Sequence, residues 1–312
     1  MLHPSSMKGL RPAPLASLVA DVRMRRILLD VSPPWPIFNP SIATDGGGFS
    51  MIVRSQNVRY QYGRLRYDEQ PRSISYLVKL DSVLGVSSVD PIDEDPEDPR
   101  RHQAPYLGFE DLRLIQLKGR WFAIGDSWEL GPNGNPEMAL LELDGARVTR
   151  VNRLVGPFQG RPEKNWMPFV HTDELHFVYS CGPLIVFRYD QRTRGVTWAA
   201  LSESPELTTP FRGGSQGLAV EDGYLFVVHE TTYYEAEVRS YLHRFVRIGF
   251  DLRLNAVSRS FTLTGEMREF CAGAAIHGSE LVLSLGVRHT EAWLAVVPLA
   301  SALDLLEPVS AS

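Results

Sequence analysis

The chain has 312 residues, 44% of them hydrophobic and 22% charged, and its formal net charge of −5 argues against a nucleic-acid or anionic-membrane surface. No apolar run is long enough to span a bilayer, and residues 1–14 lack the apolar centre of a secretory signal. Two cysteines, Cys181 and Cys271, exclude a disulfide scaffold although not a single bridge, and we expect both to be reduced core residues of a cytoplasmic protein.

The first 30 residues are expected to form an extension before a single domain that spans residues 31–312. Between Pro14 and Leu29 apolar residues recur roughly every three to four positions, a spacing that predicts a short helix. We expect this segment, helical or extended, to pack outside the first repeat of the domain.

From residue 38 onward the chain repeats one pattern five times. A polar or Gly-rich cluster opens an apolar, β-branched or aromatic run, a turn follows, and a second strand runs back. The clusters begin at residues 38, 109, 162, 212 and 269. Second strands are predicted within residues 50–54, 121–124, 175–179, 224–228 and 281–284, and further strands within 185–189 and 241–246.

The spacing of the clusters predicts an all-β fold, a five-bladed β-propeller. Successive clusters start 71, 53, 50 and 57 residues apart, and a period near fifty residues lies in the range of propeller blades. The first strand of every blade faces a central channel, so the side chains of all five clusters should meet there. The longest interval contains residues 55–105, rich in Arg, Tyr, Asp and Pro, which we expect to form a lid over the channel mouth.

Carboxylates dominate the second repeat. Asp111 and Arg113 share one face of the predicted strand and Glu110 lies on the other, so a structural ion pair between blades is one interpretation. The other is a carboxylate that binds sugar hydroxyls or acts as an acid or base. Asp126 and Glu129 follow the next strand, where a buried carboxyl with a raised pKa could protonate a leaving oxygen, unless both are solvated loop residues.

The third and fourth clusters suggest a sugar site and an anion site. Glu163, Lys164 and Asn165 precede Trp166, and a Trp beside hydrogen-bonding groups suits a carbohydrate, although it could instead pack between blades.

Residues 212–215, Arg-Gly-Gly-Ser, would let the backbone approach a ligand closely, unless they are only a turn. Arg212 could then hold an anion together with Arg54 and His229, while a structural histidine is the alternative for His229.

Other chemistries find no support in the sequence. It contains no His-Glu-x-x-His run, paired Cys spacing, phosphate loop, dinucleotide fingerprint or Gly-x-Ser-x-Gly elbow. Glycoside chemistry needs only carboxylates and hydrogen-bonding groups, which the clusters supply. We therefore expect no metal and no organic cofactor.

Together these motifs resemble glycoside hydrolase family 130 and its relatives, five-bladed propellers that cleave or make β-mannosides. Residues 38–42 resemble the family's Asn-Pro opening, and residues 163–166 are similar to its third-blade segment. Residues 108–113 resemble its Gly-x-Glu-Asp-Pro-Arg signature, with Leu112 in place of Pro. The likeness covers residues 36–298, thinly between the motifs.

The resemblance implies inverting phosphorolysis or hydrolysis of β-mannosides, and related propellers transfer mannose from activated donors. The family's general acid is an Asp after the second-blade hairpin; Glu129 occupies that register here, and Asp126 lies three residues earlier. Arg54 and His229 resemble phosphate-binding residues of the family, whereas its fifth-blade Asp is replaced within residues 286–291. These departures imply a divergent branch.

We hypothesise a carbohydrate-active enzyme that acts on a mannoside-like bond by inverting phosphorolysis, with inorganic phosphate as co-substrate. Asp126 or Glu129 would be the acid, and Arg54, Arg212 and His229 would hold phosphate. Hydrolysis would need a base, for which Glu269 is the candidate. Candidate sugar-binding residues are Asn39, Ser41, Glu110, Asp111, Arg113, Glu163, Lys164, Asn165, Trp166, Ser215 and Gln216.

Two alternatives remain at this point. A glycosyltransferase would use the same anion pocket for the phosphate of an activated donor, and a propeller that had lost its acid would only bind sugars. In each case the expected partner is an oligosaccharide or glycoside, with no nucleic acid and no membrane, and a homo-oligomer is left open.

Overall fold

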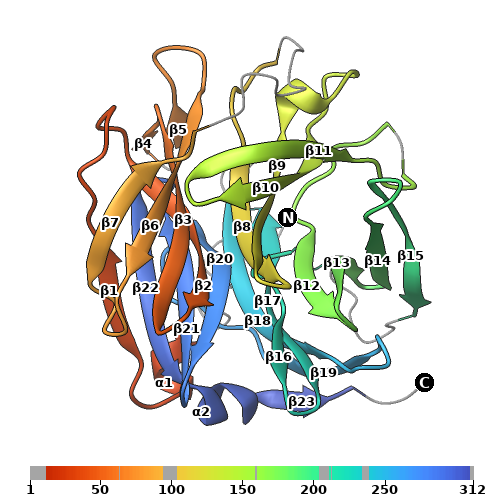
Figure 1. The fold of residues 1–312 in the computed structure, drawn as a ribbon. Coiled ribbons are helices and arrows are strands. Elements are labelled where there is room, and N and C mark those ends of the chain that lie inside the picture. Colours follow the sequence, from red (N-terminus) through yellow and green to blue (C-terminus); the bar gives the residue numbers. More distant parts are fainter. Residues whose placement is uncertain are drawn as a thin grey trace, which may run out of the picture.

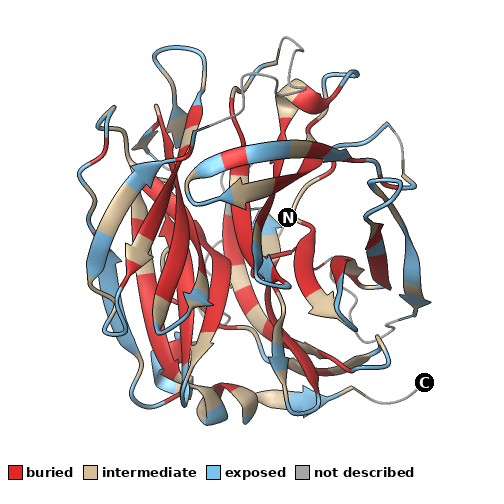
Figure 2. Ribbon diagram, viewed as in Figure 1, coloured by how far each residue is buried: buried red, intermediate tan, exposed pale blue. Residues whose placement is uncertain are grey.

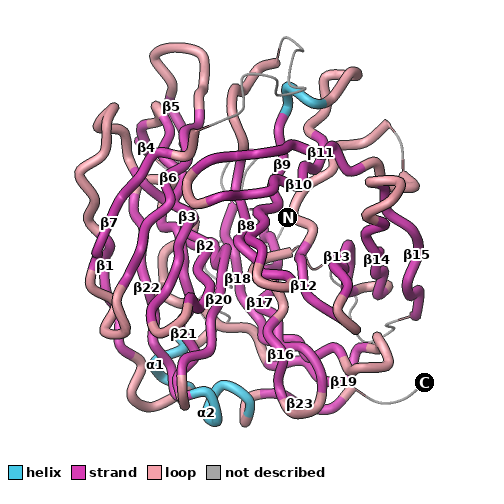
Figure 3. Tube along the Cα trace, viewed as in Figure 1, coloured by secondary structure: helices cyan, strands magenta, loops and turns pink. Residues whose placement is uncertain are grey.

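The computed structural model describes residues 12–62, 64–93, 104–158, 160–203, 211, 213–233 and 239–309. In this part of the chain five antiparallel sheets are arranged in a ring, with two short α-helices (Figures 1 and 3). The predicted all-β, five-bladed propeller is therefore confirmed. Neither helix in these residues has the length and apolar character needed to cross a bilayer.

Each blade is an antiparallel meander that starts at the channel and ends at the outside. Blade 1 consists of β2 Ile37–Asp45, β3 Gly48–Gln56, β6 Ser73–Leu80 and β7 Val86–Pro91. Blade 2 consists of β8 Glu110–Leu117, β9 Arg120–Ser127, β10 Glu137–Asp144 and β11 Arg147–Leu154. Blade 3 consists of β12 Met167–His171, β13 Glu174–Cys181, β14 Leu184–Asp190 and β15 Gly195–Ser202. Blade 4 consists of β16 Leu218–Val220, β17 Gly223–Tyr233, β18 Arg239–Ile248, β19 Leu254–Ser258 and β23 Leu306–Pro308. Blade 5 consists of β20 Glu269–His277, β21 Glu280–Val287, β22 Glu291–Pro298 and β1 Arg23–Ile27. All of the predicted second strands are present.

The hydrophobic core lies between the blades. Five apolar clusters fill the five interfaces between neighbouring blades, represented in turn by Ile52, Phe177, Phe226, Phe245 and Val282. Inner strands are covered by a blade on each side, which is why their apolar runs are nearly continuous. Outer strands such as β7 and β15 are largely exposed (Figure 2).

The ring is closed by the N-terminal strand. β1 pairs antiparallel with β22, from Arg23 opposite Val296 to Ile27 opposite Ala292, and completes blade 5. The expected extension therefore contributes a strand to the propeller. At the other end of the chain, α2 Leu299–Leu303 leads into β23, which adds a fifth strand to blade 4.

The helix expected between Pro14 and Leu29 is mostly absent. Only α1, Leu15–Leu18, is helical, and Leu15 packs in the cluster between blades 4 and 5, not outside the first blade. The helix ends at Leu18, because Val19 already has an extended backbone with φ of −128° and ψ of 129°. Residues 23–27 then form a strand because they pair with β22, and the spacing of apolar residues within the segment cannot indicate such a distant partner.

The long interval in the first repeat contains ordinary blade strands as well as an addition. β6 and β7 are the two outer strands of blade 1. The addition is a separate hairpin of β4 Arg59–Gln61 and β5 Arg64–Arg66, followed by the segment 67–72. Residues 94–103 of the expected lid lie outside the described part of the chain.

Candidate functional site

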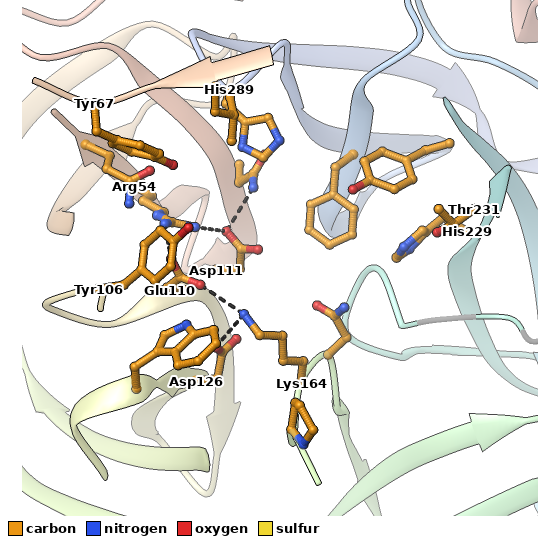
Figure 4. Close-up of a pocket in the computed structure, with 18 residues that line it drawn as sticks. Arg54, Tyr67, Tyr106, Glu110, Asp111, Asp126, Lys164, His229, Thr231 and His289 are labelled. Carbon is orange, nitrogen blue, oxygen red and sulfur yellow. Dashed lines mark hydrogen bonds and ion pairs between the residues drawn. The ribbon is translucent and has the colours of Figure 1, made fainter. Parts of the chain in front are cut away.

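A pocket of about 430 Å³ lies at the end of the channel where inner strands begin and second strands end. All five blades and the added hairpin contribute side chains to it (Figure 4). Its lining consists of Asn39, Arg54, Gln56, Leu65, Tyr67, Tyr106, Glu110, Asp111, Asp126, Trp128, Pro162, Lys164, Asn165, His229, Thr231, Tyr241, Phe270 and His289.

Four lining residues have a left-handed backbone: His289, with φ of 58°, and one residue from each of the first three polar clusters. The φ angles of Asn39, Asp111 and Asn165 are 46°, 49° and 63°. Asn and Asp tolerate this region better than other residues that carry a Cβ. In blades 1 and 2 the strand register also shifts at this point, as in a β-bulge, and bulges redirect side chains at the edge of a site. The polar openings of the repeats thus turn their side chains towards the pocket.

The floor of the pocket is an alternating row of carboxylates and cations. Arg54 pairs with Glu110 and places Nη1 3.0 Å from Asp111 Oδ1. Lys164 Nζ lies 3.1 Å from Glu110 Oε2 and 3.2 Å from Asp126 Oδ2. These contacts, drawn in Figure 4, connect blades 1, 2 and 3 through charged groups.

The carboxylates of this row have pKa values displaced in opposite directions. Burial raises the pKa of Asp126 to about 7, and the negative charges of Glu110 and Asp111 add to this while Lys164 opposes it. Asp111 is also buried, but Arg54 and the amide of Asn39, 2.8 Å away, outweigh burial and lower its pKa to about 2. For Glu110, Arg54 and Lys164 likewise outweigh burial and lower the pKa.

Both cations of the row are fully engaged by carboxylates. Burial alone would lower their pKa values, yet Glu110 and Asp111 raise that of Arg54, and Asp126 and Glu110 raise that of Lys164. Each cation is therefore charged and forms ion pairs with the carboxylates beside it in the floor.

Aromatic and imidazole rings form the walls. His229 packs edge-on against Tyr241 and Phe270, each with ring centroids 5.0 Å apart. On another side, Tyr106 lies between Tyr67 and Trp128, at centroid distances of 6.0 and 5.5 Å. Rings of this kind can cover the apolar faces of a sugar, while the charged floor contacts its hydroxyls.

Eight of the predicted site residues lie together in this pocket: Asn39, Arg54, Glu110, Asp111, Asp126, Lys164, Asn165 and His229. Several other lining residues were not predicted from the sequence, chiefly the rings of Tyr67, Tyr106, Trp128, Tyr241, Phe270 and His289. One signal was available for His289. It lies just beyond the second strand of its blade, β21, close to where Asp126 lies near the end of the second strand of blade 2, β9.

The other two candidate catalytic carboxylates do not line the pocket. Glu129 Oε2 accepts a hydrogen bond of 2.7 Å from Gly108 N and faces a different cavity beside Arg72 and Asp93. Glu269 is fully buried, where it accepts bonds from the backbone of Leu263 and Thr264. Both carboxylates hold backbone donors in place.

Four predicted ligand contacts are instead bonds between blades or within one blade. Ser41 Oγ accepts from Leu114 N at 2.8 Å. Ser215 Oγ accepts from Val227 N at 2.9 Å, and the Gln216 amide bonds to the backbone of Ile42 and Ala274. Arg113 is buried with no exposed surface.

Trp166 and Glu163, which accepts a hydrogen bond from the Trp ring, also belong to the interior. Trp166 is fully buried among Phe177 and Phe187 in the core between blades 2 and 3, and its Nε1 donates to Glu163 Oε2 at 3.0 Å. The prediction that Trp166 stacks on a sugar is therefore wrong, because its ring lies inside the interface between blades 2 and 3.

The Gly-Gly pair serves packing and does not face a ligand. A Cβ on Gly213 would lie 1.8 Å from the carbonyl oxygen of Asn165. Only glycine allows blades 3 and 4 to approach this closely. Arg212 lies outside the described residues.

Comparisons with known proteins find the fold but no close relative. No protein-family model matches the sequence, and no curated protein matches it. Among solved structures, β-1,2-mannobiose phosphorylase from Listeria innocua is 12% identical, with a TM-score of 0.66 over 91% of this chain and 99% of its own. A structure from the GH130 family of mannoside phosphorylases is 10% identical, with a TM-score of 0.64 over 89% and 86%.

A glycosyl hydrolase from Bacteroides ovatus is 11% identical, with a TM-score of 0.61 over 88% of this chain and 87% of its own. At such identities the likeness establishes architecture and not activity. The chain thus has the five-bladed propeller fold of the mannoside phosphorylases and glycoside hydrolases, as a divergent sequence.

Proposed function

We propose that the protein is a carbohydrate-active enzyme that cleaves or forms a mannoside-like glycosidic bond, with Asp126 as the general acid. The observation that carries this proposal is a buried carboxyl with a pKa of about 7 in a pocket beside ionised carboxylates. A general acid works best when its pKa is near the working pH, and pairs of carboxyls with separated pKa values are typical of glycosidic chemistry. Glu129 is the weaker candidate because it does not line the pocket.

In this reaction Asp126 would donate its proton to the glycosidic oxygen as the bond to the anomeric carbon breaks. Glu110 and Asp111 remain ionised, so they can accept hydrogen bonds from sugar hydroxyls, and Asn39 orients Asp111. The aromatic wall of Tyr67 and Trp128 would cover apolar ring faces. The pocket volume is in the range of small-molecule sites.

The nucleophile is proposed to be inorganic phosphate, which would attack the opposite face of the sugar and invert the anomeric centre. His229 is the residue that would contact the phosphate, because it lines the pocket on the blade 4 wall, away from Asp126 (Figure 4). Water is the second candidate, and one observation favours it. Arg54 and Lys164, the lining cations with permanent charge, are already held by Glu110, Asp111 and Asp126.

The test is turnover of β-mannosides with and without phosphate, and of mannose 1-phosphate in the reverse direction. Release of mannose 1-phosphate supports phosphorolysis, and release of mannose independent of phosphate supports hydrolysis. Asp126→Asn should abolish turnover whereas Glu129→Gln, whose amide oxygen can still accept from Gly108, should retain it. Turnover of GDP-mannose alone would favour a transferase, and sugar binding without turnover would contradict the enzymatic proposal.

A further inference from the structure

Arg113 lies beneath the pocket and contacts four blades. Its Nε donates to Gly214 O at 2.5 Å in the segment before β16, and its Nη1 donates to Asp111 O at 3.2 Å in its own blade. Its Nη2 donates to Asn165 Oδ1 at 3.1 Å, and the guanidinium carbon lies 5.8 Å from the ring centroid of Phe270. No part of the residue is exposed.

Three partners of this guanidinium, Asp111, Asn165 and Phe270, line the pocket, whereas Arg113 itself does not. A buried guanidinium must be satisfied by hydrogen bonds and nearby negative charge. Here burial lowers its pKa and the carboxylates Asp111 and Asp126 counteract this. The group thus forms a fixed set of donors directly under the ligand-facing side chains.

The contact with Asn165 determines which end of the amide faces the ligand. A guanidinium has donors only, so the atom that it contacts must be the amide oxygen. The Nδ2 group is then the free polar end of a side chain that lines the pocket, and within the described residues no hydrogen bond of Nδ2 to the protein is present. The left-handed backbone of Asn165, with φ of 63°, adds a second constraint on where the side chain points.

We propose that Arg113 is a positioning residue that makes Asn165 a dedicated hydrogen-bond donor to an oxygen acceptor of the ligand. This inference rests on the proposed function for the identity of the ligand. The acceptor is an oxygen from one of two sources, a sugar hydroxyl or inorganic phosphate. Arg113 itself does not touch the ligand, in contrast to the role expected from the sequence.

The orientation of the amide can be tested without a ligand. We would compare crystal structures of the wild type and of Arg113→Lys. The resolution must be high enough to assign the amide N and O of Asn165 from their hydrogen-bond partners. A lysine has one nitrogen and cannot reach Gly214 O, Asp111 O and Asn165 Oδ1 together. We expect Asn165 to keep one orientation in the wild type and to occupy more than one in the variant. A single unchanged orientation in Arg113→Lys would overturn the positioning role.

The donor role is tested by calorimetric binding of methyl β-D-mannoside, its monodeoxy analogues and inorganic phosphate. Asn165→Asp keeps the shape and presents an acceptor in place of the donor. We expect it to weaken binding of the sugar or of phosphate by about tenfold or more, the scale of one lost hydrogen bond. The matched control is Asn255→Asp, on β19, the fourth strand of blade 4.

The two oxygen sources are separated by the analogues. If the acceptor is a hydroxyl, one monodeoxy mannoside binds the wild type about tenfold more weakly than the parent, and this discrimination disappears in Asn165→Asp and in Arg113→Lys. If it is phosphate, only phosphate binding is lost. Arg150→Lys, on the outer strand β11, should change neither.

Unchanged binding of both ligands in Asn165→Asp would overturn the donor role. A wild type that binds neither methyl mannoside nor phosphate would contradict the proposed function and the donor role together, and the crystallographic comparison would still decide the orientation of Asn165.

Discussion

Glu110 and Asp126 face each other across β8 and β9, yet the same environment moves their pKa values apart. Both are buried, which favours the neutral acid. Glu110 forms ion pairs with Arg54 and Lys164, whereas among the residues that the structure describes Asp126 pairs only with Lys164. The second cation keeps Glu110 ionised, and its negative charge then helps to keep Asp126 protonated. One proton on the pair is therefore favoured near neutral pH.

The pKa of Asp126 predicts a pH dependence of stability. Folded Asp126 keeps its proton up to about pH 7, whereas in the unfolded chain it is released near 3.8. Folding therefore takes up a proton between these values, and this group's contribution to stability falls as pH rises through that window. The urea midpoint of the wild type minus that of Asp126→Asn should therefore become smaller as the pH is raised from about 5 to about 8.

The control for this measurement is Asp222→Asn, an exposed carboxylate that pairs with Arg247 at the surface. Its midpoint relative to the wild type should change little over the same pH range. A difference between wild type and Asp126→Asn that stays constant, or increases with pH, would mean that Asp126 is ionised in the folded protein.

Glu269 allows a prediction that separates structure from catalysis. Its two oxygens accept from Leu263 N, Thr264 N and the Thr264 hydroxyl, and His243 Nδ1 lies 3.5 Å away. In Glu269→Gln one oxygen becomes a donor that faces other donors. We expect a loss of about 3 kcal/mol in the free energy of unfolding, measured by urea denaturation, because buried donors lose their acceptor.

The same variant should retain its activity per folded molecule at a temperature well below its melting point, since Glu269 does not line the pocket. Lost turnover in a fully folded Glu269→Gln protein would restore Glu269 as the catalytic base expected from the sequence.

At the scale of elements, the sequence predicts strands and blade order well because each depends on local features. Turn residues bound apolar runs, and this is enough to place β3, β9, β13, β17 and β21. The direction in which a polar side chain points is not local. Asn165 and Trp166 are adjacent, yet one lines the pocket and the other is in the core. Likewise, Glu269 opens its strand as Glu110 does, but the backbone of residues 263 and 264 covers it.

The segment between β11 and β12 carries Lys164 and Asn165 and is held by Arg161. The Arg161 guanidinium lies 4.1 Å from the ring centroid of Phe158 and 5.2 Å from that of Tyr179, and Arg161 Nε lies 3.6 Å from Glu163 Oε1. This set of contacts anchors the loop on the outside of the pocket.

Replacing Arg161 by Ala should loosen this segment while leaving the blades intact. Because the side chain is about half exposed, the stability loss should be within about 1 kcal/mol. Hydrogen–deuterium exchange should become faster in peptides covering residues 155–166 and unchanged elsewhere. The matched control is Arg188→Ala, an equally exposed arginine that pairs with Glu174 on blade 3. Equal exchange in the two variants would show that Arg161 does not anchor the loop.

At the scale of the whole molecule, the two ends of the chain have different tasks. β1 supplies the outer strand of blade 5, which otherwise has three strands, and buries Ile27 between blades 5 and 1. β23 is a fifth strand on blade 4, which has four strands without it. Helical spacing in residues 14–29 did not predict this closure, because the partner of β1 lies about 270 residues away in sequence.

Removal of β1 should therefore destabilise the protein far more than removal of β23. Deleting residues 1–28 exposes the edge of β22 and removes Ile27, so we expect a loss of about 3 kcal/mol or more relative to deletion of residues 1–22, which retains β1. Deleting residues 306–312 removes an outer strand whose residues are partly exposed and should cost about 1 kcal/mol. The measurement is the free energy of unfolding from urea titrations followed by tryptophan fluorescence. If both strand deletions cost the same, closure by the N-terminal strand would not be what holds the ring, and the interblade apolar clusters alone would have to account for its stability.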